Sequence, residues 1–119
     1  MPEASEIRGI AMRPADHRWV DHDPGSAFVV LGMHGEGGVS TLTRFSAGTI
    51  GSWHTHPGGE EFYVLEGHIR VGGEDFRAGD YLYTPPGGGH QVEAVTDALL
   101  FVSLPRLPVY EAAANSGTE

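Results

Sequence analysis

Cysteine and lysine are both absent from this 119-residue chain, whose basic side chains are seven arginines. Without cysteine there is no thiolate nucleophile, disulfide or thiolate metal site, and without lysine there is no Schiff-base or lysine general-base chemistry. Sixteen acidic residues bring the formal net charge to -9, which argues against nucleic acid or anionic lipid as a partner. The chemistry that remains belongs to histidine, carboxylate, tyrosine and arginine.

Long apolar runs are also missing. No stretch of 18 apolar residues occurs, and the first 20 residues lack a basic region followed by an apolar segment of signal-peptide length. We therefore expect a cytoplasmic protein without a membrane partner. Because 39% of the residues are apolar and only 19% are charged, the chain is predicted to fold, and its length suits one domain.

Glycine- and proline-rich turn signals recur at short intervals, and the segments between them are too brief for average helices. Several segments are rich in β-branched and aromatic residues, which favours strands. They are residues 27–33, 39–45, 61–66, 81–84 and 98–104. Residues 68–77 are predicted to form a β-hairpin, since Gly72-Gly73 suits a two-residue turn. The pattern predicts an all-β sandwich or barrel.

The ends of the chain differ in composition from its middle. Residues 1–25 are predicted to form an N-terminal arm, residues 26–108 the β-barrel, and residues 109–119 a C-terminal tail.

The chemistry concentrates in the segment GSWHTHPGGEEFYVLEG. His54 and His56 are two residues apart, so on a strand they would share a face, and the turn that follows can bring Glu60 beside them. A second glycine-rich segment ends in His90, which could add a third imidazole. Three imidazoles and a carboxylate suit Fe, Mn, Ni, Cu, Co or Zn better than Ca or Mg.

A simpler interpretation exists for each part of this pattern. One His-x-His on a strand is usually structural or exposed, and glutamates beside a Gly-Gly turn are often solvated. The joint recurrence of glycines and candidate ligands in two separated segments favours a metal site.

The spacings in both segments resemble conserved motifs of the cupin superfamily. Gly48-x5-His54-Thr55-His56-x3-Glu60-x6-Gly67 is similar to the first motif, G-x5-H-x-H-x3,4-E-x6-G. Gly79-x5-Pro85-Pro86-Gly87-x2-His90 is similar to the second, G-x5-P-x-G-x2-H-x3-N, with Ala94 in place of the asparagine. The resemblance implies a jelly-roll antiparallel β-barrel that binds a divalent metal through His54, His56, Glu60 and His90. Glu61 competes with Glu60, but the six-residue spacing to Gly67 selects Glu60.

Within the superfamily the chain most resembles small single-domain cupins of the ChrR-like branch, which includes anti-sigma cupins and diketone or hydroxyacetophenone dioxygenases. The resemblance implies an enzyme, with iron as the first choice of metal, that oxidises or cleaves a small diketone, hydroxyketone or phenolic substrate. Glu60 would be a permanent ligand or a catalytic base. Lewis-acid isomerase, cyclase or lyase chemistry, or a non-catalytic regulatory role, are the alternatives.

Further residues are weaker candidates. Arg44, Phe62, Tyr81 and Tyr83 are predicted to line the substrate pocket, although an arginine at a strand edge is usually solvated and aromatic residues are usually core. His17, His22, His34 and His68 are not expected to bind metal. Trp53 is expected to pack against another sheet or a subunit interface. We also expect a homodimer, because pairing would cover the edge strands of a small barrel.

Overall fold

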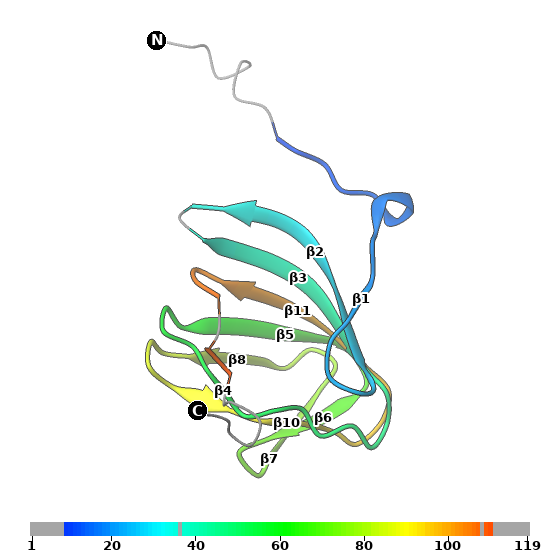
Figure 1. Ribbon diagram of the computed structural model, residues 1–119. Helices are drawn as coiled ribbons and strands as arrows, with labels where there is room; N and C mark the ends of the chain where they lie inside the picture. The colour runs from blue at the N-terminus through cyan, green and yellow to red at the C-terminus, as the bar shows by residue number, and fades with distance from the viewer. Residues whose placement is uncertain (1–8, 36, 108, 111–119) are drawn as a thin grey trace.

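The computed structural model describes residues 9–35, 37–107 and 109–110 of the chain, and shows an almost purely β fold (Figure 1). Among these residues the one helical turn is η2 (Pro14–Asp16). The strands are β1 (Val20–Asp21), β2 (Ser26–His34), β3 (Gly38–Phe45), β4 (His54–Thr55), β5 (Glu60–Glu66), β6 (His68–Val71), β7 (Glu74–Arg77), β8 (Tyr81–Thr84), β9 (Gly89–His90), β10 (Val92–Ala94), β11 (Ala98–Leu104) and β12 (Val109–Tyr110). All their pairings are antiparallel.

Three sheets share these strands. The large sheet has the order β1-β2-β3-β11-β5-β8 and forms the curved wall in Figure 1, with the small sheets β10-β6-β7 and β12-β4-β9 facing it. The hydrogen-bonded ladders of the described strands therefore divide into three sheets, and a fully closed barrel remains a prediction. Each of the five segments predicted as strands lies within one of the strands of the large sheet.

The predicted hairpin is present. Strands β6 and β7 pair from His68 opposite Arg77 to Val71 opposite Glu74. Both turn residues have positive φ, 59° at Gly72 and 82° at Gly73, which is the backbone of the tightest hairpin turns. Glycine occupies both positions because residues with a side chain adopt this backbone at a cost.

Alternation of side chains along the strands places the core between the sheets. In β5 the exposure alternates residue by residue over its first five positions, and β11 shows the same period of two. The Phe62 and Phe76 rings, 5.6 Å apart between centroids, join the large sheet to β7. The buried cluster is Val39, Phe62, Val64, Ile69, Val71, Phe76, Val92, Ala98, Leu100, Val102 and Leu104.

The predicted arm and tail both contribute short strands. Strand β1, within residues 1–25, pairs with β2, and β12, within residues 109–119, pairs with β4. These two-residue strands carry too few residues for a periodic signal in the sequence. The division into arm, barrel and tail stays a prediction, and residues 1–8 and 111–119 lie outside the described residues.

Candidate metal centre

Strands β4 and β9 bring two imidazoles together. His54 is the antiparallel partner of His90, and Thr55 is the partner of Gly89. Residues directly opposite one another in a ladder project from the same face. The two rings accordingly lie with their centroids 4.7 Å apart, so backbone pairing joins the two sequence motifs at their histidines.

His56 joins them from the turn that follows β4. Its backbone N–H donates to the Gly88 carbonyl at 2.8 Å, and its own carbonyl accepts hydrogen bonds from the N–H groups of Gly59 and Gly87. The His56 side chain is completely buried, and its ring centroid lies 4.6 Å from that of His54. The two histidines of the His-x-His pair therefore converge on the same point.

Glu60, the first residue of β5, completes the group. Its Oε2 atom lies 3.4 Å from His56 Nε2, and its Oε1 atom lies 3.3 Å from His90 Nε2. The preceding residue, Gly59, has φ of +85°, and a Cβ atom there would lie 3.1 Å from the Thr84 carbonyl oxygen. A glycine is needed at this position for the chain to turn the carboxylate inward.

The spacing of the donor atoms fits a single cation. One ligand atom from each of the four residues lies within 4.8 Å of all the others. His56 Nε2 and His90 Nε2 are 3.1 Å apart. Two atoms bound at about 2.1 Å to one ion lie about 3.0 Å apart at a right angle and about 3.4 Å apart at the tetrahedral angle. Within the described residues, Glu60 Oε1 and His56 Nδ1 are also buried without a hydrogen-bond partner. The donor set therefore fits a divalent transition metal.

Burial sets the protonation of these groups in the metal-free protein. Desolvation, with a smaller contribution from nearby histidines, lowers the pKa of His56 to about 4 and that of His90 to about 3. Desolvation also lowers the pKa of His54. The same effect raises the pKa of Glu60 to about 8. At neutral pH the imidazoles are thus neutral, as metal ligands must be, whereas the carboxyl group holds a proton that a bound cation would displace.

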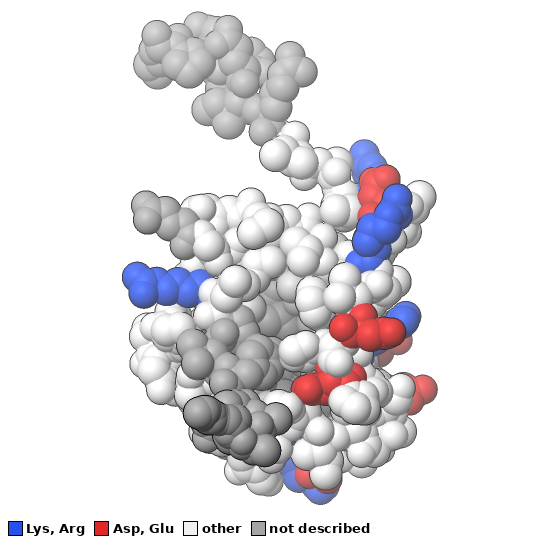
Figure 2. Space-filling model, in the orientation of Figure 1, with Lys and Arg blue, Asp and Glu red and all other residues white. Residues whose placement is uncertain are grey.

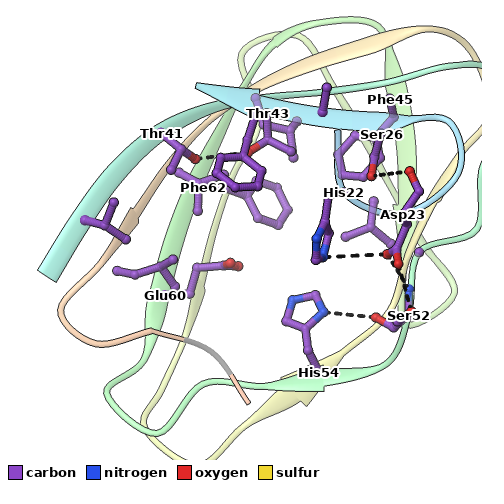
Figure 3. A pocket seen from close by; sticks show the side chains of 18 of the residues that line it. His22, Asp23, Ser26, Thr41, Thr43, Phe45, Ser52, His54, Glu60 and Phe62 are labelled. Carbon is purple, nitrogen blue, oxygen red and sulfur yellow. Dashed lines mark hydrogen bonds and ion pairs between the residues drawn. The ribbon is translucent and has the colours of Figure 1, made fainter. Parts of the chain in front are cut away.

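A hydrogen-bonded chain fixes the orientation of His54. Its Nδ1 atom lies 3.0 Å from the Ser52 carbonyl oxygen, so Nδ1 carries the proton and Nε2 is the ligand atom. Ser52 is in turn held by Asp23, which accepts hydrogen bonds from its backbone N–H at 3.0 Å and its hydroxyl at 3.1 Å (Figure 3). Asp23 belongs to the predicted arm, so this segment helps to position the loop that carries a ligand.

Three of the four residues, His54, Glu60 and His90, line a cavity of about 340 Å³, which is at the small end of the range for ligand pockets, whereas His56 is fully buried beside them. Strands β2, β3, β11 and β5 of the large sheet form one wall. The lining is mostly apolar, and its ionisable members among the described residues are His22, Asp23, His54, Glu60 and His90. A small molecule inside the cavity would therefore meet ionisable groups at the candidate metal site and at His22 and Asp23.

Residues 8–108 match the family of ChrR cupin-like domains. This chain is a member of that cupin family. The structure is consistent with the cupin jelly roll, and the residues that match the two cupin motifs include all four candidate ligands.

Three relatives illustrate how varied similar cupins are. The DNA damage-repair/toleration protein DRT102 of Arabidopsis thaliana is 31% identical over 90 residues, which are 71% of this chain and 28% of that protein. A chain in the crystal structure of Rhodobacter sphaeroides SigE in complex with the anti-sigma ChrR is 26% identical, with a TM-score of 0.69, over 77% of this chain and 50% of that one.

The third is an acetylacetone dioxygenase from Acinetobacter johnsonii. It is 13% identical, with a TM-score of 0.76, over 98% of this chain and 85% of that one. At this identity the likeness concerns the fold alone. This cupin spans less than a third of the curated Arabidopsis relative, so the activity of that whole protein is not transferred to it.

Among the predicted pocket residues, the structure places only Phe62 in the cavity. Tyr81 and Tyr83 lie on the outer face of β8 and are 53% and 56% exposed, while Leu82 and Thr84 point inward. Arg44 is exposed on β3, and its guanidinium lies 4.1 Å from the centre of the Trp19 ring. The pleat of each strand turns these three side chains outward, so they do not line this cavity.

The polar cavity-lining residues that were not predicted include His22, Asp23, Thr41 and Thr43. His22 and Asp23 come from the segment before the barrel, and no local pattern indicates that this segment crosses to the Ser52 loop. The two threonines follow from alternation along residues 39–45, a signal that was available in the sequence.

His22 lines the same cavity as the candidate ligands, whereas the other three histidines lie outside it. His34 Nε2 lies 3.0 Å from the Ser40 hydroxyl, and His68 Nε2 lies 2.7 Å from Asp75 Oδ1. His17 stacks edge-on against Trp19. Trp53 is 45% exposed in the single chain, so packing at a subunit interface stays a prediction. The described part of the chain also contains no helix with the length and apolarity needed to cross a membrane.

Proposed function

We propose that this cupin is a metal-dependent dioxygenase that oxidises or cleaves a small diketone, hydroxyketone or phenolic substrate. The observation that carries the proposal is that His54, His90 and Glu60, three members of the four-residue group, line a mostly apolar cavity. A purely structural metal site has no need of such a cavity, whereas a substrate with two neighbouring oxygen atoms needs both open metal positions and an apolar enclosure.

Iron is the first choice of metal, with Mn, Ni, Cu, Co and Zn as further candidates for the same nitrogen and oxygen donors. A bound ferrous ion would supply a Lewis acid and a one-electron redox centre for substrate and dioxygen. His54, His56 and His90 would hold it as neutral ligands. The apolar walls would exclude water from the reacting atoms.

Glu60 has two roles open to it. Because burial raises the pKa of Glu60 to about 8, its carboxyl group can accept or release a proton near neutral pH. It lies within 3.4 Å of two imidazoles, a position that supports a role either as the fourth ligand or as the base that removes an acidic proton from the substrate. We propose it as the catalytic residue.

The decisive test combines metal analysis with dioxygen uptake. Protein purified without chelator is analysed for its metals, and the iron-loaded form is assayed in an oxygen electrode against β-diketones and hydroxylated aromatic ketones. Uptake that requires substrate and disappears in His90→Ala supports the proposal. Absence of uptake by every metal-loaded form, with metal bound stoichiometrically, would contradict it.

A regulatory role is the second candidate, because the 26% identical match lies in a complex between a sigma factor and an anti-sigma protein. In that case the chain binds metal or a small molecule without turnover. Binding of a sigma factor by the zinc-loaded protein, measured by calorimetry, together with no dioxygen uptake, would favour this role. Turnover without dioxygen would instead favour Lewis-acid isomerase, cyclase or lyase chemistry.

We further propose that the protein forms a homodimer. The outer face of the large sheet presents Phe101, Tyr63 and Tyr81 in one row across β11, β5 and β8, all at least 37% exposed. A row of aromatic side chains on a sheet face is typical of an association surface. Light scattering on the purified protein measures the mass directly.

A further inference from the structure

Two threonines form a separate polar group in the wall of the cavity. Thr41 and Thr43 lie two residues apart on β3, both line the cavity, and their hydroxyl oxygens are 3.0 Å apart (Figure 3). Thr41 is buried. Their neighbours across the sheet, Val102 opposite Thr41 and Leu100 opposite Thr43, are apolar. The pair is thus a polar point between apolar neighbours on the adjacent strand.

The pair has hydrogen-bonding capacity left over. Each hydroxyl can donate one hydrogen bond and accept two. Within the described residues, each makes its only side-chain hydrogen bond with the other, and this bond uses one of the two protons. One donor and several acceptor positions therefore remain available on the cavity side. A buried donor without a partner is unfavourable, so a bound group that satisfies it gains affinity.

The register of the sheet separates this pair from the metal site. Thr41 pairs with Val102, Val102 pairs with Phe62, and Glu60 lies two residues before Phe62 on β5. Two strand spacings and two residues along a strand correspond to roughly 10 Å and roughly 7 Å, respectively. One small molecule can contact both groups only if its polar ends are separated by an apolar body.

The charges of the residues that line the cavity limit which chemical groups the threonines can bind. No arginine is among the described residues that line the cavity, and the chain contains no lysine. On the face shown in Figure 2 the arginine side chains gather mainly beside the N-terminal arm. His22 also lines the cavity, but its Nε2 atom lies 3.9 Å from the Asp23 carboxylate. A carboxylate or phosphate at the threonine end would thus be buried without an arginine or lysine to neutralise it, which is strongly unfavourable. A neutral hydroxyl or carbonyl group can be satisfied by the two hydroxyls alone.

We infer that Thr41 and Thr43 are specificity-determining residues, which select substrates with an uncharged hydroxyl or carbonyl group at the end opposite the metal-chelating oxygens. This inference rests on the proposed function, since it takes the chelating end to lie at the histidines and Glu60. It adds a second contact point and a requirement that the distal group be neutral.

The test uses ligand binding to the zinc-loaded protein, in which no redox turnover occurs. The probes are 1-phenylbutane-1,3-dione, its 4-hydroxyphenyl analogue and its 4-carboxyphenyl analogue, with affinities measured by calorimetry. The hydroxyl compound is expected to bind about tenfold more tightly than the phenyl compound, and the carboxyl compound more weakly than both.

The variants Thr43→Val and Thr41→Val/Thr43→Val preserve side-chain shape and remove the hydroxyls. They should abolish the preference for the hydroxyl compound while zinc stoichiometry and affinity for the phenyl compound stay unchanged. Ser40→Ala, on the same strand but hydrogen-bonded to His34 outside the cavity, is the matched control and should keep the preference. Thermal unfolding verifies that each variant is folded, and the single variant tests the inference if the double one is not.

The outcomes separate the two proposals. Equal binding of the phenyl and hydroxyl compounds to the unmodified protein, or a preference that survives in Thr43→Val and in the double variant, overturns the role of the threonines and leaves the proposed function standing. Failure of all three compounds to bind zinc-loaded protein overturns the proposed substrate class and the inference together.

Discussion

The inner and outer faces of the large sheet carry similar residue types, which are buried on the inner face and exposed on the outer face. Glu60 and Glu61 are adjacent on β5, but Glu60 is buried between imidazoles with a raised pKa, whereas Glu61 is exposed and accepts a hydrogen bond from Tyr81 at 2.8 Å. Phe62 and Tyr63 repeat the contrast one step further along. The pleat of one strand thus decides which glutamate is a candidate ligand and which is a surface charge, because the residue type is the same at both positions.

The largest expected effect is on metal binding. His90→Ala removes one of the candidate ligands that line the cavity, so metal affinity should fall by more than about a hundredfold, as expected when loss of even a supporting group costs about 10- to 100-fold. His34→Ala, which changes a histidine outside the group, should retain full stoichiometry. Elemental analysis after dialysis measures both. Full metal content in His90→Ala would contradict the proposed ligand set.

The next largest effect concerns the packing of β5. Phe62→Ala removes a side chain that is 2% exposed and contacts the core, and should lower the free energy of unfolding by about 3 to 5 kcal/mol. Tyr63→Ala changes a residue that is 44% exposed and should cost much less. Denaturant unfolding of the metal-free proteins gives both values. Equal losses would remove the distinction between the two faces.

A pH effect sharpens the comparison of the two glutamates. The pKa of Glu60 is raised to about 8, so metal binding at pH 7 should release close to one proton, and apparent affinity should rise up to about tenfold per pH unit until about pH 8. His56 and His90 add nothing, because their lowered pKa values of about 4 and 3 leave them neutral throughout this range. Calorimetry in buffers of different ionisation enthalpy counts the protons.

The matched controls for that experiment are Glu60→Gln and Glu61→Gln. The first should release no proton, and the second should behave like the unmodified protein. The stability of the metal-free protein should change with pH in the opposite direction to metal affinity. Glu60 loses its proton above about pH 4.5 in the unfolded chain but only above about pH 8 in the folded one. The free energy of unfolding should therefore fall across this window in the unmodified protein and less in Glu60→Gln.

The smallest expected effect lies at the edge of the site. Asp23→Asn weakens the acceptor that holds the Ser52 loop, and should reduce metal affinity by about tenfold without changing the ligand set. Asp21→Asn, an exposed carboxylate on β1, is the control. Metal competition titrations measure the ratio of the two affinities. No difference between them would show that the arm does not support the centre.

The sequence predicts much of this arrangement because the information is local. The Gly-Gly hairpin, the strands of the large sheet and the convergence of His54 and His56 follow from turn chemistry and alternation over a few residues. The position of Glu60 beside them was expected from the turn that follows. The approach of His90 required the motif resemblance, since a pattern within one segment does not specify which distant strand pairs with it.

Other features depend on the tertiary fold. The segment YLYT is apolar or aromatic in its first three positions, so its pattern does not say which parity faces the core, and Tyr81 and Tyr83 point outward. Arg44 is held by Trp19 from a distant segment. The bonds of Asp23 to Ser52 likewise join distant parts of the chain and have no periodic signal.

The bond between Asp23 and Ser52 has a practical consequence for protein engineering. A truncated variant that begins at residue 26 would retain every candidate ligand and every long strand. It would nonetheless lack Asp23, whose hydrogen bonds hold Ser52. The His54 imidazole would then lie on a loop with fewer restraints. A fusion partner at the N-terminal side therefore needs a linker that leaves the hydrogen bonds between Asp23 and Ser52 intact.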